Sequence, residues 1–340
     1  MTIVPAGARD LHDATARHRA PTYLVTGVAG FIGSHLAGAL LDRGDEVIGI
    51  DAFTDYYPRS RKDANLAGLL RRPGFRFVDA DIVQAPLHVL LAGVDGVFHL
   101  AAQPGVRGSW GRTFSVYVHD NLLATQCLFE AAARARVRVV FASSSSVYGN
   151  APAYPTREDA PLRPVSPYGV TKRCCEDLAH AYAEVAGLDF IALRYFTVYG
   201  PRQRPDMAVE RVAAALNNGG RFDVYGTGEQ SRDVTYVDDA VTATLAVMDA
   251  APAGAVYNVG GGSETTLREI IDLCQTLAGR ELELRFGEEA PGDVRRTAAD
   301  TSRIHEDVGW SPQVTLEDGL MTQLAWAAAP VPIALAEAGD

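Results

Sequence analysis

Lysine is almost missing from this chain of 340 residues. Of 31 basic residues only Lys62 and Lys172 are lysines, so arginine supplies nearly all the positive charge. A lysine kept where the chain otherwise prefers arginine suggests that a compact cation is needed there. The formal net charge of −11 argues against nucleic acid or an anionic membrane surface as a partner. Small anionic ligands stay possible, since they need only a local basic pocket.

Cysteine is also scarce, and long apolar runs are absent. The four cysteines (Cys127, Cys174, Cys175 and Cys274) show neither metal-ligand spacing nor a paired framework. We therefore expect reduced thiols, no bound metal and a cytoplasmic location. No apolar run reaches the ~18 residues needed to span a bilayer, which predicts no membrane association. Residues 1–20 lack the apolar core of a secretory signal and are expected to form a disordered N-terminal extension.

The rest of the first half alternates β-rich runs with helical patterns. Strands are predicted at 23–26, 46–51, 76–78, 96–100, 137–143 and 190–195, and helices at 33–43, 121–134 and 167–185. This alternation predicts an α/β fold with a Rossmann-type doubly wound parallel sheet over residues 21–200. Beyond residue 200, turn clusters and shorter helices predict a smaller C-terminal α/β substrate domain, mainly 201–330. Later segments can return to the first domain, and 331–340 form a tail.

A glycine-rich turn, Gly27-x-x-Gly30-x-x-Gly33, follows the first predicted strand and opens the first helix. Glycines let the backbone approach a pyrophosphate, which a helix N-terminus also attracts. Asp51 ends the second strand, where a carboxylate can accept both ribose hydroxyls of adenosine and would repel a 2′-phosphate. The pattern predicts a binding site for NAD rather than NADP.

Tyr168 and Lys172 form a second candidate site. Their four-residue spacing places both side chains on one face of a helix that Ser166 can cap and Pro167 can begin. An ammonium group favours a neighbouring phenolate. The pair therefore predicts a base that works near neutral pH.

These motifs, in this order, resemble the extended short-chain dehydrogenase/reductases, in the branch of nucleotide-sugar epimerases and dehydratases. The resemblance extends from about Tyr23 to Trp326 and rests on residues 26–33, 81–82, 99–103, 121, 143–149, 168–172, 193–201 and 232–238. It implies an NAD-dependent enzyme, a UDP-sugar substrate and a homodimer joined through two helices of each subunit. A non-catalytic NAD-binding sensor is the alternative from another class, and the presence of Ser144 with Tyr168 and Lys172 argues against it.

The resemblance also implies roles for individual residues. The catalytic residues would be Ser144, Tyr168 and Lys172. The cofactor would contact Gly27, Gly30, Phe31, Ile32, Gly33, Asp51, Asp81, Ile82, Leu100, Ala101, Ala102, Gln103, Asn121, Tyr168, Lys172 and Tyr195. The substrate would contact Arg107, Ser144, Ser145, Ser146, Thr197, Arg204 and Arg232. Arg232 would grip the substrate diphosphate through parallel donors.

Ser145 and Ser146 distinguish between members of this branch. Sugar 4,6-dehydratases carry Asp and Glu at these positions, and UDP-glucuronate decarboxylases carry Glu at the second. Serines cannot supply the acid and base of an elimination. With Thr197 and Arg204 they can instead bind a carboxylate, so the chain looks most like a UDP-glucuronate 4-epimerase. One departure is that Arg202 and the glutamine after it stand where that subfamily has Trp-Gly. A UDP-glucose/UDP-galactose 4-epimerase and a UDP-glucuronate decarboxylase remain the alternatives.

Overall fold

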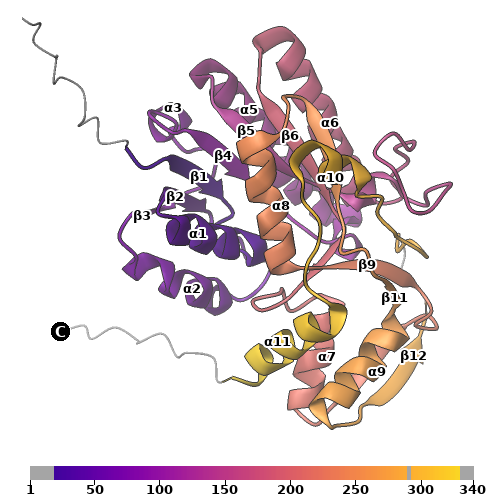
Figure 1. Ribbon diagram of the computed structural model, residues 1–340. Helices are drawn as coiled ribbons and strands as arrows, with labels where there is room; N and C mark the ends of the chain where they lie inside the picture. The colour runs from indigo at the N-terminus through magenta and orange to yellow at the C-terminus, as the bar shows by residue number, and fades with distance from the viewer. Residues whose placement is uncertain (1–18, 289–291, 330–340) are drawn as a thin grey trace, which may run out of the picture.

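A seven-stranded parallel sheet forms the centre of the computed structural model, which describes residues 19–288 and 292–329 (Figure 1). Its strand order is β10-β6-β5-β4-β1-β2-β3. The strands are β1 (Thr22–Thr26), β2 (Glu46–Asp51), β3 (Phe75–Asp79), β4 (Gly96–His99), β5 (Arg138–Ser144), β6 (Phe190–Tyr195) and β10 (Ala255–Val259). All the pairings are parallel, which confirms the predicted Rossmann-type sheet.

Helices cover both faces of this sheet. One face carries α1 (Phe31–Arg43), α2 (Arg59–Ala67), η1 (Leu69–Arg71) and α8 (Val237–Ala250), and the other carries α3 (Leu87–Leu90), α5 (Ala124–Ala135) and α6 (Pro167–Ala186). Successive residues of one strand enter opposite cores, as Leu24 and Val25 do, and both are fully buried. Burial on both faces is why these strands appear in the sequence as continuous apolar runs.

The ends of the helix that carries Tyr168 follow the predicted signals. The Ser166 hydroxyl accepts a hydrogen bond from the amide of Gly169 at 3.1 Å, and Pro167 occupies the first helical position of α6. Gly187 ends the helix with φ of 67°, in the left-handed region that glycine tolerates. Local capping chemistry therefore sets where this helix begins and ends.

The segment between β4 and α5 is less regular than predicted. It contains η2 (Arg107–Ser109), η3 (Gly111–Thr113), α4 (Phe114–Tyr117) and a π-helical segment, η4 (Val118–Leu123), before α5 begins. A single α-helix from residue 121 was predicted, and the structure replaces its first turn by the wider π-helical one. Such turns are rare and frequently occur at functional sites.

The C-terminal part adds two small sheets and three helices below the main sheet in Figure 1. One sheet contains β7 (Thr197–Tyr199), β9 (Ser231–Tyr236) and β11 (Glu264–Thr266), and the other contains β8 (Arg221–Tyr225) and β12 (Glu283–Gly287). The helices are α7 (Ala208–Asn217), α9 (Leu267–Ala278) and α11 (Leu316–Ala328), while α10 (Ser302–Val308) packs on α8 and β10. Both α8 and β10 come after residue 200 in the chain but pack with the main sheet. The domain boundary at residue 200 stays a prediction.

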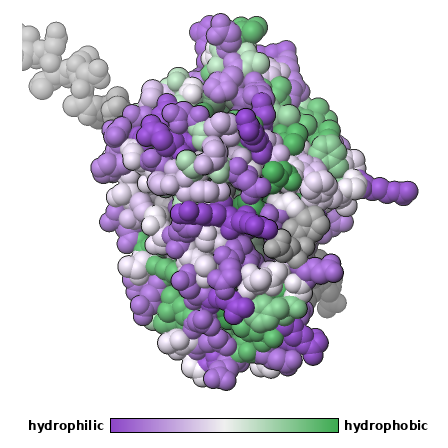
Figure 2. Space-filling view, turned by 90° about the vertical axis from the view of Figure 1, so that its right-hand side faces the viewer, coloured by the Kyte–Doolittle hydropathy of each residue, from purple (hydrophilic) through white to green (hydrophobic). Residues whose placement is uncertain are grey.

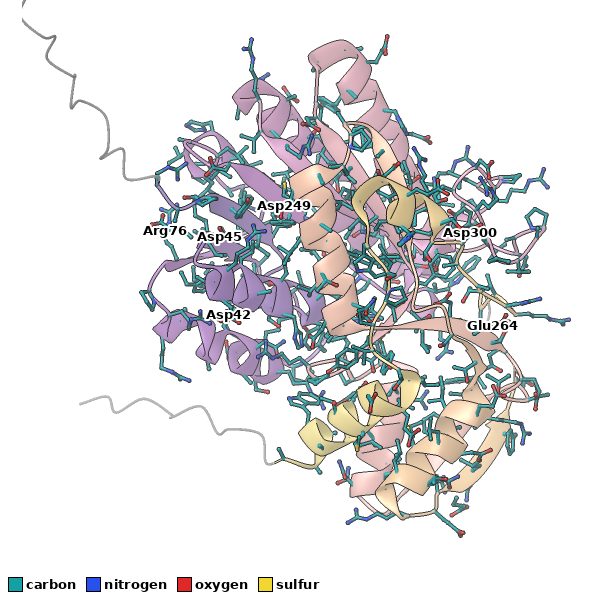
Figure 3. All side chains as sticks on the ribbon, in the orientation of Figure 1. Asp42, Asp45, Arg76, Asp249, Glu264 and Asp300 are labelled. Carbon is teal, nitrogen blue, oxygen red and sulfur yellow. The ribbon has the colours of Figure 1, made fainter. Side chains whose placement is uncertain are left out.

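The returning helix α8 is tied to α1 by charge. Arg43 at the end of α1 donates through Nε to Asp45 at 2.5 Å and through Nη1 to Asp249 of α8 at 2.8 Å. Figure 3 labels the two carboxylates at this junction. The contact joins chain segments more than 200 residues apart.

The predicted N-terminal extension and the predicted tail fall largely outside the described residues. Within the extension, residues 19 and 20 are described, and Arg19 Nη2 pairs with Asp95 at 2.8 Å. Arg19 is therefore an exception to the prediction that residues 1–20 are disordered.

Candidate active site

A cleft of about 850 Å³ lies at the carboxyl ends of the central strands. It includes the point where the neighbours β1 and β4 lead to opposite halves of the sheet, which is where doubly wound folds bind ligands. Most of the predicted site residues line it: Gly27, Gly30, Phe31, Ile32, Gly33, Asp51, Asp81, Ile82, Leu100, Ala101, Ala102, Arg107, Ser144, Ser145, Ser146, Tyr168, Lys172, Tyr195, Thr197 and Arg204. Gln103, Asn121 and Arg232 are predicted site residues that do not line it.

The glycine-rich turn packs so closely against neighbouring backbone that it cannot accept side chains. Without side chains, its backbone stays open to a ligand. Gly27 has φ of 69°, and a Cβ there would lie 2.8 Å from the amide nitrogen of Ala101. A Cβ on Gly33 would overlap the carbonyl oxygen of Gly27. Gly30 precedes α1 without a side-chain cap, so the first amides of that helix are available to a pyrophosphate. The residues present therefore fit a dinucleotide.

Asp51 and Lys62 both line the part of the cleft where adenosine is predicted to bind. The Asp51 carboxylate accepts hydrogen bonds from the amides of Ala29 at 3.0 Å and Phe53 at 2.9 Å. Each oxygen keeps a second acceptor site, so both can still receive ribose hydroxyls. Burial raises the pKa of Asp51, although these amides and Lys62 oppose the rise. Lys62 also lines the cleft, and its Nζ donates to the Thr54 carbonyl at 2.7 Å. No role was predicted for Lys62 from the sequence. The signal that could have identified it is the scarcity of lysine in this chain.

We expect purified protein to carry NAD, and Asp51→Asn to retain less of it. Losing a charged acceptor for two ribose hydroxyls typically costs ~1.5–3 kcal/mol, or roughly 10- to 100-fold in affinity. The measurement is chromatography of the nucleotide released from each protein by heating. Recovery of NADP from the wild type, or equal NAD from both proteins, would contradict the role of Asp51.

Tyr168 and Lys172 lie one turn apart on α6 and both line the cleft. Lys172 is 4% exposed, and its Nζ donates to the Ala142 carbonyl at 2.7 Å near the end of β5. An ammonium has three donors, so two are left for a ribose or a phenolate. The Tyr168 ring packs edge-on against Tyr117, with ring centroids 6.3 Å apart. A backbone contact thus holds Lys172 and an aromatic contact holds Tyr168 on the cleft side of α6.

The serine run turns beside this pair. Ser144 ends β5, and Ser145–Val147 form the short helix η5. The Ser144 hydroxyl accepts from the amide of Ser146 at 3.1 Å and donates to its hydroxyl at 3.1 Å. Thr197 begins β7 and faces the same cleft. Four hydroxyl groups therefore surround the space next to Tyr168.

A buried ion pair lies behind the serines. Glu176 of α6 receives two hydrogen bonds from Arg194 of β6, at 3.0 Å from Nε and 2.7 Å from Nη2. Ser143 donates to the same carboxylate, and Arg194 Nη1 donates to the Tyr148 hydroxyl at 2.8 Å. Both charged side chains are nearly inaccessible to solvent. Glu176 follows Lys172 by one helical turn, so the ion pair fixes the rotation of the helix that carries the base.

Asn121 does not line the cleft, and its predicted contact with the cofactor stays a prediction. Its Oδ1 accepts from the amide of Gln103 at 2.7 Å, and its Nδ2 donates to the Gln103 carbonyl at 3.1 Å and to Thr171 Oγ1 at 3.0 Å. The π-helical turn places this side chain, which is 1% exposed, between the loop after β4 and α6. Asn121 therefore positions the loop that includes Gln103.

Tyr195 lines the cleft, but its hydroxyl is engaged elsewhere. It forms a hydrogen bond of 2.6 Å with Thr244 Oγ1 on α8. The predicted cofactor contact of Tyr195 is therefore limited to groups other than its hydroxyl.

Arg107, which lines the cleft, lies near Arg232, which does not. Arg107 Nη2 pairs with Asp293 at 2.7 Å, and its guanidinium lies 4.3 Å from the ring centroid of Tyr225. Arg232 donates to the Ser231 carbonyl at 2.8 Å. Burial lowers the pKa of Arg232. The nearby charge of Asp293 opposes this shift, and the charge of Arg107 adds to it. The contact of Arg232 with a diphosphate stays a prediction.

Arg204 lines the cleft and is paired within the protein. Its Nε donates to Asp206 Oδ1 at 3.1 Å, and its Nη2 donates to Oδ2 at 3.4 Å. Burial opposes its charge, yet Asp206 above all raises the pKa of Arg204, and Tyr168 adds to this effect. Arg204 therefore has a counter-charge even when the substrate has no carboxylate.

The loop that carries Arg204 is firmly held despite its unusual sequence. Arg202 has φ of 65°, in the left-handed region. Gln203 is 1% exposed, and its Nε2 donates to the Val198 carbonyl at 2.9 Å. Its Oε1 accepts from Gln323 of α11 at 2.9 Å and from the amide of Glu210 at 3.0 Å. The residues that replace Trp-Gly thus anchor the loop to two helices of the C-terminal part.

Membrane-spanning helices and metal sites are both absent from the described part of the chain. No helix there combines the length and the apolar character needed to cross a membrane. No group of three or more His, Cys, Asp or Glu side chains within residues 19–288 and 292–329 could hold a metal ion.

The chain matches the model of the NAD dependent epimerase/dehydratase family over residues 23–260. It is 42% identical to an uncharacterized UDP-glucose epimerase, YtcB, of Bacillus subtilis, covering 89% of this chain and 96% of that one. It is 36% identical to a UDP-glucuronate 4-epimerase of Thermodesulfobacterium geofontis, covering 89% and 95%. The crystal structure of UDP-glucuronic acid 4-epimerase from Bacillus cereus, in complex with UDP-glucuronic acid and NAD, superposes with a TM-score of 0.88 at 40% identity, covering 90% and 98%. The chain therefore belongs to the NAD dependent epimerase/dehydratase family and is an enzyme that uses NAD.

Proposed function

We propose that this protein is a UDP-sugar 4-epimerase that interconverts UDP-glucuronate and UDP-galacturonate. The observation that carries the proposal is that Arg204 and Tyr168 line one cleft. The hydroxyls of Ser145, Ser146 and Thr197 line the same space. Relatives named as UDP-glucuronate 4-epimerases support this choice of substrate.

Tyr168 and Ser144 would handle the proton of the sugar 4-hydroxyl. When bound, NAD supplies a hydride acceptor and donor for C4. Tyr168 would remove the hydroxyl proton with the help of Ser144, one helical turn from the ammonium group of Lys172. The 4-keto sugar turns about its phosphate linkage before Tyr168 returns the proton. No oxidant is consumed, since the sugar is oxidised and then reduced at the same carbon.

A 4-keto uronic acid is a β-keto acid and tends to lose CO₂. That loss requires the bond from C5 to the carboxylate to stand perpendicular to the plane of the ketone. We infer that Ser145, Ser146, Thr197 and Arg204 hold the carboxylate away from this geometry. The site would thus use preorganised donors to suppress a side reaction.

The UDP-glucose/UDP-galactose 4-epimerase alternative gains support from one contact. Because Arg204 is already paired with Asp206, a neutral hydroxymethyl group of the substrate would not leave Arg204 without a counter-charge. The UDP-glucuronate decarboxylase alternative has weaker support, because Ser145 and Ser146 provide no carboxylate at the two positions after Ser144.

A product assay with UDP-glucuronate, UDP-glucose and UDP-galactose tests the proposal. Chromatography should resolve the epimer, the pentose and the 4-keto product of each reaction. We expect UDP-glucuronate to give UDP-galacturonate with little pentose. A clear preference for UDP-glucose would replace the proposal by the first alternative, and a dominant UDP-pentose would replace it by the second.

Arg204→Ala should weaken the binding of UDP-glucuronate and increase the share of pentose. Removing a hydrogen bond that involves a charged group typically costs ~1.5–3 kcal/mol, which corresponds to a rise of roughly 10- to 100-fold in KM when KM reports binding. The measurements are KM and the ratio of pentose to epimer. Any turnover of UDP-glucose by the same variant is the internal control, because that substrate has no carboxylate. Unchanged KM and unchanged product ratio would reduce Arg204 to a loop charge.

The implied homodimer and the cytoplasmic location also stay proposals. Val116 of α4, Leu123 of η4 and Val170 of α6 are exposed apolar residues on the helical layer expected to pair with a second copy. In Figure 2, hydrophobic residues reach the surface in separate patches among hydrophilic ones. These exposed side chains favour a dimer that covers them.

A further inference from the structure

We propose that Tyr56 and Asp206 are positioning residues that orient Arg204 towards the substrate carboxylate. Through this orientation they would determine how much of the 4-keto intermediate keeps its carboxylate. The inference rests on the proposed function and adds to it two residues that sequence reasoning did not identify. Both line the cleft together with Arg204.

Asp206 occupies one edge of the Arg204 guanidinium. The two hydrogen bonds, 3.1 Å from Nε and 3.4 Å from Nη2, both involve the side of the group that carries Nε. A guanidinium has five donors in a rigid plane, so the Nη1 edge remains for a second carboxylate. The ion pair thus fixes the plane of Arg204 without using all of its donors.

Tyr56 holds Asp206 in place from a different part of the chain. Its hydroxyl donates to Asp206 Oδ2 at 3.0 Å, and the Arg204 guanidinium lies 5.9 Å from its ring centroid. Burial raises the pKa of Tyr56 and Asp206 adds to the rise, so the hydroxyl stays protonated and donates at neutral pH. Tyr56 therefore supports both members of the ion pair.

The position of Tyr56 links three loops around the cleft. It follows β2, while Asp206 lies between β7 and α7. Gly105, in the loop after β4, has φ of 96°, and a Cβ there would overlap the Tyr56 hydroxyl. The Gly105 carbonyl accepts a hydrogen bond of 2.8 Å from Tyr117, whose ring packs against Tyr168. The same contacts thus connect the carboxylate-binding side with the base.

A competing role for Asp206 predicts the opposite result. If Asp206 only paired with Arg204 until the substrate carboxylate displaced Asp206, removing the charge of Asp206 would tighten the binding of UDP-glucuronate. If Asp206 positions Arg204, removing its charge loosens the guanidinium and weakens binding. Asp206→Asn therefore distinguishes the two, because it keeps the shape of the side chain.

Tyr56→Phe tests the proposal with Tyr182→Phe as the control. Tyr182 lies on α6 and does not line the cleft, and its hydroxyl accepts a hydrogen bond from Gln126 Nε2 at 2.6 Å. We expect Tyr56→Phe to raise the KM for UDP-glucuronate and the ratio of pentose to epimer roughly fivefold each, as loss of one hydrogen bond typically does. Asp206→Asn should raise both further. The released NAD and the melting temperature should match the wild type, and Tyr182→Phe should leave the KM and the product ratio unchanged.

The outcomes separate this inference from the proposed function. If the wild type makes no UDP-galacturonate, the proposed function and the inference fall together. If the wild type does so and Tyr56→Phe keeps its KM and product ratio, only the inference fails. Tighter binding by Asp206→Asn would also overturn it, in favour of the competing role. A loss of melting temperature in Tyr56→Phe without a change in product ratio would show a purely structural role.

Discussion

Tyr168→Phe is expected to lower turnover by at least the ~10²-fold typical of a lost general base. The variant keeps the ring, and with it the edge-on contact with Tyr117 at 6.3 Å. It removes only the hydroxyl that would accept the substrate proton. Because Lys172 is anchored to the Ala142 carbonyl, the neighbouring ammonium should stay in place. We therefore expect a folded protein with normal NAD content and little activity.

Tyr182→Phe is the matched control, on the same helix but outside the cleft. The hydroxyl of Tyr182 accepts a hydrogen bond from Gln126 Nε2 at 2.6 Å. Tyr182→Phe therefore also removes one phenolic hydroxyl group. Turnover and melting temperature should be measured for both variants. Near-normal turnover in a folded Tyr168→Phe protein would refute the assignment of Tyr168 as the base.

Glu176→Ala is expected to lower the free energy of unfolding by ~3–5 kcal/mol. The variant leaves the guanidinium of Arg194 buried without its counter-charge, and it removes the acceptor of Ser143. Replacing both partners by apolar residues would cost less, because no charge would then be left in the core. The effect should extend to activity, since Glu176 lies one turn beyond Lys172 on α6.

Glu184→Ala on the exposed side of α6 is the control for this change. Surface substitutions of this kind usually shift stability by less than about 0.5 kcal/mol. Urea denaturation of both variants and the wild type gives the comparison. A loss below about 1 kcal/mol for Glu176→Ala would mean that the ion pair does not hold α6.

Local chemistry in the sequence was sufficient for the frame of the site. Alternating apolar runs and helical patterns predicted the parallel sheet, and β2 and β6 have the predicted bounds. Ser166 and Gly187 marked the ends of α6, because caps depend on residues next to each other in the chain. The spacing of Tyr168 and Lys172 placed both on one helix face for the same reason. Glycine spacing likewise predicted the turn that begins α1.

Tertiary structure alone decided which side chains support this frame. Asn121, which was predicted to contact the cofactor, links Gln103 with Thr171, and these partners come from separate segments. Arg204 gained Asp206 as a partner only two residues away, a pairing that the geometry of the loop permits and that spacing does not predict. Hydrogen bonds between loops depend on how the sheet brings its strand ends together. The sequence by itself therefore determined the parallel sheet, the glycine-rich turn and the placement of Tyr168 and Lys172 on one helix face. The contacts around Asn121 and Asp206 arose only in the folded chain, because they join segments that are far apart in the sequence.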